Sequence, residues 1–204
     1  CTLVICGGPG VGHADDVKPW KLRDAVGAPS WLDFGLAHRS RVERLENDYR
    51  AGTGTDATAL VMRTLLAVEA GSEPIRLRLE VEDSRAYATD EAPLNTTSVD
   101  ALELLEATIG MTRHGLVASG DQIDARLGRI TLDVGSRRLV ARNRFRNTIN
   151  GFTGLDAQWT SATKKIARAF AVVPVTRRPS DSEALEGNDI ELDRENRDSL
   201  FWGA

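Results

Sequence analysis

The sequence predicts an all-β protein built from antiparallel, amphipathic strands. Apolar and charged residues alternate through most of the chain from Trp31 onward, and a period of two is the strand period. The alternating segments approach the roughly 9 to 11 residues of a tilted transmembrane strand, whereas strands of soluble proteins commonly have roughly 5 to 6. The links between them include very short turns and long polar loops, as in outer-membrane β-barrels.

Seven segments carry this alternation. The expected strands are residues 31–43, 60–69, 75–82, 99–111, 123–134, 152–160 and 165–175. The third is the clearest, because Ile75, Leu77 and Leu79 alternate with arginine and glutamate. The fourth has an Ala-Leu-Glu-Leu-Leu-Glu core that also suits a helix, and the seventh has no clear phase.

Gly128 lies inside the fifth expected strand, and we expect a bulge there that changes the phase of the alternation. Ile130, Leu132 and Val134 would then continue the apolar face. Arg129 would join the charged face.

The connections fall into two classes. The short turns are residues 71–74 and 161–163, and the long polar links are residues 46–56, 84–98, 135–150 and 177–199. If the first strand starts on the periplasmic side, the short turns lie there and the long links lie on the outer side. The link 112–122 departs from this rule, because it should be a short turn and is rather long.

The N-terminal stretch, residues 1–14, is apolar and glycine-rich and ends in Gly-His-Ala. Small residues at that position suit signal peptidase, so we expect residues 1–14 to be a truncated signal peptide and residues 15–204 to be the N-terminal part of a barrel domain. Both cysteines, Cys1 and Cys6, would then be removed. The alternative is a buried first strand over residues 2–6 and a glycine loop, although no P-loop lysine follows.

Periodicity leaves two architectures open. In a soluble sandwich the apolar face is the core, whereas in a membrane barrel it meets lipid and the charged face lines a lumen. Aromatic residues make up 5% of the chain, which is sparse for a barrel. The net charge of −4 argues against a globally basic nucleic-acid binder, and no apolar run is long enough for a membrane-spanning helix.

Arginine greatly outnumbers lysine, since all but four of the 26 basic residues are arginine. Arginine binds carboxylates in a bidentate way and keeps its charge, which suits contact with an acidic polymer. The densest cluster lies between Arg137 and Arg146 and lacks the stacking aromatic residues of a nucleic-acid site.

The run LGRITLDVGSRRLVARNRFRNTINGF, residues 127–152, closely resembles the alginate export family of outer-membrane β-barrel proteins. DSRAYATDEAPLNTTSVDALELLEA, FTGLDAQW and PVTRRPSD resemble the same family in the same order. The resemblance implies a barrel of roughly 18 strands, of which this chain would supply about seven or eight. It also implies location in the outer membrane of a Gram-negative bacterium and an arginine-lined lumen that passes an anionic uronate polysaccharide.

We therefore expect a channel for an alginate-like polymer or another acidic solute, in contact with outer-membrane lipid and with periplasmic export components. The expected lumen arginines are Arg39, Arg63, Arg76, Arg78, Arg126, Arg129, Arg137, Arg138, Arg142, Arg144 and Arg146. The acids expected to hold them are Asp33, Glu43, Glu69, Glu80 and Asp133.

The sequence leaves two alternative functions open. One is a soluble periplasmic or secreted β-sandwich that binds carbohydrate. The other is an enzyme such as a polysaccharide lyase, which the sequence disfavours because His13, His38 and His114 lie in the signal remnant, on an apolar strand phase and in a turn. We expect no enzyme activity, no cofactor, no metal site and no nucleic-acid partner.

Overall fold

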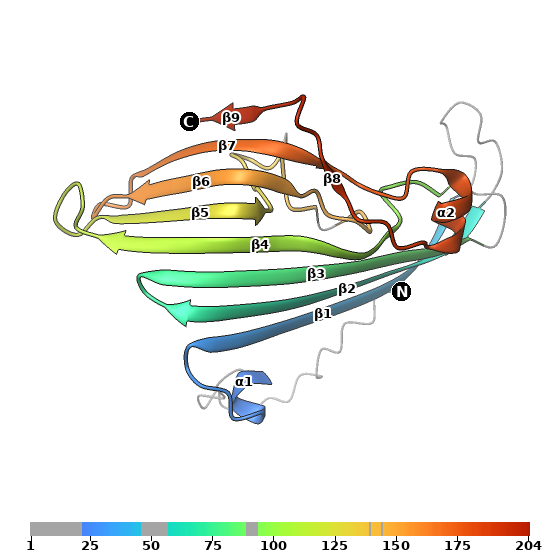
Figure 1. Cartoon of the computed structure of the whole chain (residues 1–204), viewed down its shortest axis with the longest axis horizontal. Helices are drawn as coiled ribbons and strands as arrows, with labels where there is room; N and C mark the ends of the chain where they lie inside the picture. The colour runs from blue at the N-terminus through green and yellow to red at the C-terminus, as the bar shows by residue number, and fades with distance from the viewer. Residues whose placement is uncertain (1–21, 46–56, 89–93, 139, 144) are drawn as a thin grey trace, which may run out of the picture.

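The computed structural model describes residues 22–45, 57–88, 94–138, 140–143 and 145–204, and shows one antiparallel sheet (Figure 1). The strands are β1 (Leu32–Leu45), β2 (Ala57–Ser72), β3 (Ile75–Ala88), β4 (Asp100–His114), β5 (Gln122–Ile130), β6 (Phe152–Thr160), β7 (Ile166–Thr176), β8 (Arg194–Glu195) and β9 (Phe201–Gly203). They pair in chain order from β1 to β8, and β9 also pairs with β7. The protein is all-β, as predicted. Within the described residues the sheet does not close on itself, so it has the form of an incomplete barrel.

Two short helices accompany the sheet, α1 (Leu22–Ala25) and α2 (Ser182–Gly187). In the part of the chain that the structure describes, no helix is both long and apolar enough to cross a membrane. The turns β2–β3, β4–β5 and β6–β7 lie together at one end of the sheet, and α2 lies at the opposite end (Figure 1).

The two faces of the sheet differ sharply in exposure. Leu77 and Leu79 of β3 are 53% and 54% exposed, whereas Glu80 of the same strand is 3% exposed. We call the side that carries Leu77, Leu79 and Ile109 the apolar face, and the side that carries Arg78, Glu80 and Glu106 the charged face. A soluble sandwich would bury its aliphatic side chains, so this arrangement is that of a barrel wall and not of a sandwich.

The strand register keeps these faces continuous. Leu77 lies opposite Ile109 of β4, and Glu80 lies opposite Glu106. Farther along, Arg126 of β5 lies opposite Asp156 of β6. Because antiparallel partners project to the same side of a sheet, charged side chains of several strands gather on one face.

The connection between β5 and β6, residues 131–151, lies over the charged face. The side-chain amide of Asn147 donates hydrogen bonds to the carbonyl oxygens of Met62, Arg85 and Ser98, at 3.0, 3.1 and 2.7 Å. Asn147 is 2% exposed, so these bonds fix the connection to the sheet away from water.

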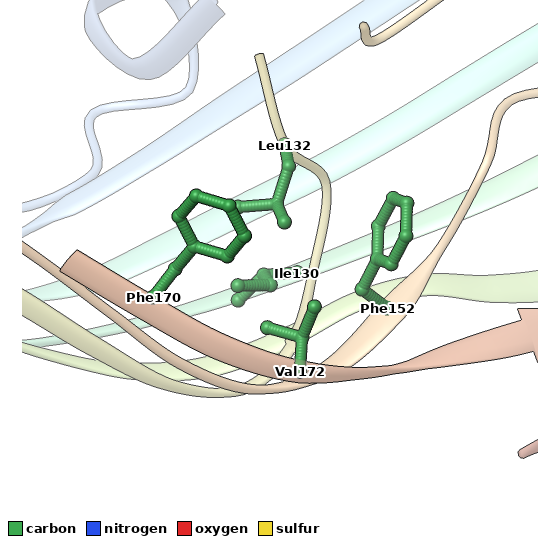
Figure 2. Packing of buried hydrophobic residues seen from close by; sticks show 5 residues of the cluster. All are labelled: Ile130, Leu132, Phe152, Phe170 and Val172. Atoms are coloured by element: carbon green, nitrogen blue, oxygen red, sulfur yellow. The ribbon is translucent and has the colours of Figure 1, made fainter. Parts of the chain in front are cut away.

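A small apolar core forms beside this connection. Ile130, Leu132, Phe152, Phe170 and Val172 point toward one another from β5, β6, β7 and the start of the connection (Figure 2). Phe201 of β9 packs on this cluster, with its ring centroid 5.0 Å from that of Phe170.

This core corrects the predicted change of phase at Gly128. The pairing runs without interruption through Gly128, and Ile130 and Leu132 are buried in the core instead of continuing the apolar face. The irregularities lie between β3 and β4, where the register shifts near Val81 and Glu82. The expected bulge is absent, and the expected place of Ile130 and Leu132 is wrong because a segment that folds back covers them. Arg129 does join the charged side, as predicted, where it pairs with Glu103.

Several predicted boundaries also change. β3 continues to Ala88, so the first part of the expected loop 84–98 is strand. β4 is a strand despite its helix-like composition, and it ends at His114, which shortens the long turn to residues 115–121. The link 177–199 contains α2 and β8.

Candidate functional site on the charged face

A pocket of about 340 Å³ opens on the charged face, beneath the connection 131–151. Its lining residues are Asp124, Arg126, Thr131, Asp133, Arg142, Asp156, Gln158 and Arg168. Six of these side chains are charged, three arginines and three aspartates, so the pocket is suited to polar groups and not to an apolar ligand.

Two arginines share one carboxylate in this pocket. Arg126 Nη2 lies 2.6 Å from Asp156 Oδ2, and Arg168 Nε lies 2.6 Å from Asp156 Oδ1. The Asp156 side chain is 8% exposed, whereas that of Arg126 is 39% exposed. Arg126, Arg168 and Asp156 together carry one surplus positive charge. An exposed guanidinium with free N–H groups can donate hydrogen bonds to a second carboxylate.

A buried network closes the pocket on the side of β3 and β4. Arg78 Nε lies 2.7 Å from Glu106 Oε2, and Arg78 Nη2 lies 2.8 Å from Glu80 Oε2. Arg142 comes down from the connection and pairs with both glutamates, with 3.4 Å between Arg142 Nη1 and Glu106 Oε1. Glu106 also accepts hydrogen bonds from the Thr131 amide and hydroxyl, at 3.0 and 2.5 Å. The charges balance here, so this network holds the connection in place.

A second arginine group lies on β1 and β2. Arg39 Nη2 donates to the Arg146 carbonyl at 2.9 Å, and Arg63 Nη1 donates to the same carbonyl at 3.2 Å. Arg41 donates to the Phe145 carbonyl at 2.9 Å and lies 4.8 Å from the centroid of the Phe145 ring. Arg41 also pairs with Glu43. Hydrogen bonds to backbone carbonyl oxygens of the connection therefore orient these three guanidinium groups.

The remaining predicted residues are more dispersed. Arg76 pairs at 3.7 Å with Glu69, which also lies 3.7 Å from Arg78, and Arg137 pairs with Asp133 at 2.9 Å. Arg138 and Arg146 are exposed on the connection, and Arg144 lies outside the described residues.

Asp33 has no arginine partner in the described part of the chain and accepts a hydrogen bond from the Phe34 amide. Of the predicted supporting acids, Glu43, Glu69, Glu80 and Asp133 contact arginines. These contacts place the side chains, while their role along a solute path stays a prediction.

Sequence reasoning missed several residues of the site, including Arg41 of the second arginine group. Arg168 lies in the segment whose phase was ambiguous, and Glu106 lies in the helix-like segment. Asp156 follows the alternation of β6, yet nothing in its neighbourhood along the chain identifies it as the acid that two arginines share. Pairing across strands would have found it, because Arg126 lies directly opposite.

Three carboxylates also gather beyond this site, on β4 and on the segment after α2. Oxygens of Asp100, Glu103 and Asp193 all lie within 4.8 Å of one another. Burial, together with the negative charge of Glu103, raises the pKa of Asp193 to about 6. Arg129 bridges two of these acids, at 2.9 Å from Glu103 and 3.2 Å from Asp193.

The family model described as alginate export matches residues 30–204, which span the whole described sheet. The chain belongs to the alginate export family. This is a family of outer-membrane transport proteins of Gram-negative bacteria, and a polysaccharide export channel is the function that membership suggests. No curated protein and no solved structure matches the chain.

Proposed function

We propose that this member of the alginate export family forms part of the wall of an outer-membrane channel that passes an anionic polysaccharide, an alginate-like uronate polymer. The observation that carries the proposal is the division of the sheet. Aliphatic side chains such as Leu77 and Leu79 are exposed on one face, and a pocket with three arginines opens on the other. A strand wall between lipid and an aqueous channel needs this division.

Arg126 and Arg168 would form the contact with the solute. Each already contacts Asp156, so both guanidinium groups are held in place before a solute arrives. A uronate carboxylate entering the pocket would bind Arg126 in competition with Asp156. That competition keeps binding weak, and a channel must bind its solute firmly enough to admit it and weakly enough to release it.

The arginines Arg39, Arg41 and Arg63 would extend the path along the charged face. Arg41 pairs with Glu43, and Glu82 lies near Arg63. Successive carboxylates of a polymer could move from one arginine group to the next, by passive diffusion. Small acidic solutes would be attracted by the same charges.

The division of the chain into a truncated signal peptide, residues 1–14, and a barrel domain, residues 15–204, remains part of this proposal. Residues 1–14 lie outside the described part of the chain. Location in the outer membrane follows for this chain if the aliphatic face meets lipid. Contact with periplasmic export components would then occur at the end of the sheet that carries the short turns.

A carbohydrate-binding β-sandwich is the alternative, and the exposed aliphatic face disfavours it. A sandwich packs two sheets through their apolar faces, whereas here the apolar cluster of Ile130, Phe152 and Phe170 lies on the charged side of a single sheet.

The test is block of ion current by sugar oligomers. The full-length protein is inserted into planar bilayers, and oligouronates or neutral oligosaccharides of equal length are added. The proposal predicts that oligouronates block the current and that neutral oligomers block it much less. Equal block by both would contradict an acidic solute, and absence of any channel would contradict the transport function.

A further inference from the structure

We propose that Asp100, Glu103 and Asp193 form a calcium site that fastens the segment after α2 to strand β4. Asp100 is the first residue of β4, and Glu103 follows on the same strand. Asp193 comes from the segment between α2 and β8. The site would join two parts of the chain that lie far apart in sequence.

The geometry fits the size of the ion. One carboxylate oxygen from each residue lies within 4.8 Å of the other two. Ca²⁺ binds oxygen ligands at about 2.3 to 2.6 Å, so oxygens bound to one ion lie within about 5.2 Å of each other, and the three oxygens of this cluster meet that limit.

An unpartnered oxygen supplies the second observation. Asp100 is 2% exposed, and its Oδ1 is buried without a hydrogen-bond partner among the described residues. A buried carboxylate oxygen that lacks a partner is costly, because it has lost water and gained nothing. A cation among the three carboxylates would satisfy it.

The other acids of the cluster have partners that hold them in position. Glu103 Oε2 accepts a hydrogen bond from the Asp193 amide at 2.9 Å, and Asp193 Oδ1 accepts one from the Arg178 amide at 2.7 Å. Arg129 contacts Glu103 and Asp193 on their remaining oxygens. Calcium ligands commonly carry such second contacts, which orient them.

The charge balance leaves room for a cation. Glu82 also lies near Asp100, so four acids meet three arginines, Arg129, Arg177 and, beside Glu82, Arg63. Arg177 donates to the Asn150 side chain at 2.6 Å and acts on Asp100 through its charge. One negative charge remains, and burial makes such an excess costly unless an ion or a proton neutralises it.

A calcium ion here would stabilise the attachment of the segment after α2 to the sheet. The segment that carries Asp193 is also held by Asn188, whose side chain bonds both the amide and the carbonyl of Ala86, at 2.8 and 3.0 Å. Leu185 of α2 packs on Val61 and Val99. The ion would add a third attachment, on β4.

The experiment measures calcium binding by the full-length protein folded in detergent, free of lipopolysaccharide and stripped with EGTA. Isothermal titration with CaCl₂ should give close to one bound ion per chain, and the thermal unfolding midpoint should rise on addition of Ca²⁺. Asp100→Asn and Asp193→Asn should each abolish the calorimetric signal and the calcium-dependent rise. Glu69→Gln, a change of an acid elsewhere on the charged face, should leave both intact.

Two results would overturn the site. One is a wild-type protein that shows no saturable calcium signal. The other is an Asp100→Asn variant that binds calcium as the wild type does, which would place any bound ion elsewhere. If Asp100→Asn does not fold, the wild-type titration and Asp193→Asn decide the matter.

Discussion

Arg142, on the connection between β5 and β6, forms an ion pair with Glu80, in the middle of β3. The Glu80 side chain is 4% exposed and that of Arg142 is 27% exposed, so the pair lies largely out of water. It ties the connection to the charged face at the edge of the arginine pocket.

Replacing Arg142 by methionine should therefore loosen the connection. Arg78 still contacts Glu80, so we expect the free energy of unfolding to fall by about 2 kcal/mol, less than the loss of a sole partner would cause. Urea unfolding in detergent measures this change. Arg138→Met, at an exposed position of the same connection, should change it by less than about 0.5 kcal/mol. Equal effects of the two variants would contradict the role of the pair.

Gly128 should not tolerate a side chain. Its φ is +124°, and a Cβ there would overlap the carbonyl oxygen of Ala107 on the neighbouring strand. Gly128→Ala should lower the free energy of unfolding by more than about 1 kcal/mol. Gly110→Ala on β4 is the matched control, because the nearest atom would lie 3.7 Å away. A Gly128→Ala variant as stable as the control would show that β5 does not have this backbone.

Asp121 should make the β4–β5 turn sensitive to acid. Its carboxylate accepts hydrogen bonds from the Trp159 indole and from the amides of Leu116, Val117 and Ala118. The indole bond is the largest cause that lowers the pKa of Asp121 below its usual 3.8, and the amide bonds add to it. The unfolded chain thus binds the proton more tightly than the folded one. The stabilisation is complete above pH 3.8 and is lost as pH falls through the lower, folded pKa.

The thermal unfolding midpoints of the wild type and of Asp121→Asn, measured against pH, test this sign. The wild type should be the more stable protein at neutral pH, and the difference should shrink below pH 3.8. A difference that stays constant into strong acid would show that the charge of Asp121 contributes nothing.

The two faces of the sheet should differ in their access to water. Ala37 of β1 and Ala169 of β7 are both exposed alanines, and the register places Ala37 on the charged face and Ala169 on the apolar face. With Cys1 and Cys6 replaced by serine, Ala37→Cys should react readily with a charged thiol reagent in lipid bilayers, and Ala169→Cys should react much more slowly. Equal rates would contradict the barrel orientation.

The strands could be predicted from the sequence because alternation is a local property. Ile75 to Glu82 shows it in a single run, and β6 begins and ends at the residues predicted. Which face meets water could not be predicted, because an aliphatic stripe reads the same against lipid and against a second sheet. The exposed fractions of Leu77 and Glu80 decide it.

The site was harder to predict than the strands. The arginines at 126, 142 and 168 belong to different strands and to a long connection, and their acids, Asp156 and Glu106, lie on other strands. Such pairs depend on register and on how the connection folds back. The same folding back buries Ile130 and Leu132, which is why their predicted place on the apolar face was wrong.

The most direct test of the account is the ion selectivity of the channel after removal of Arg126 and Arg168. Reversal potentials are measured in planar bilayers under a salt gradient, for the full-length protein, for Arg126→Gln/Arg168→Gln, and for Arg85→Gln. Arg85 lies on the opposite face from the pocket, where it contacts Asp83 at 3.0 Å. We expect anion selectivity in the wild type and in Arg85→Gln, and a clear shift toward cations in the double variant. A reversal potential that the double substitution leaves unchanged would contradict it.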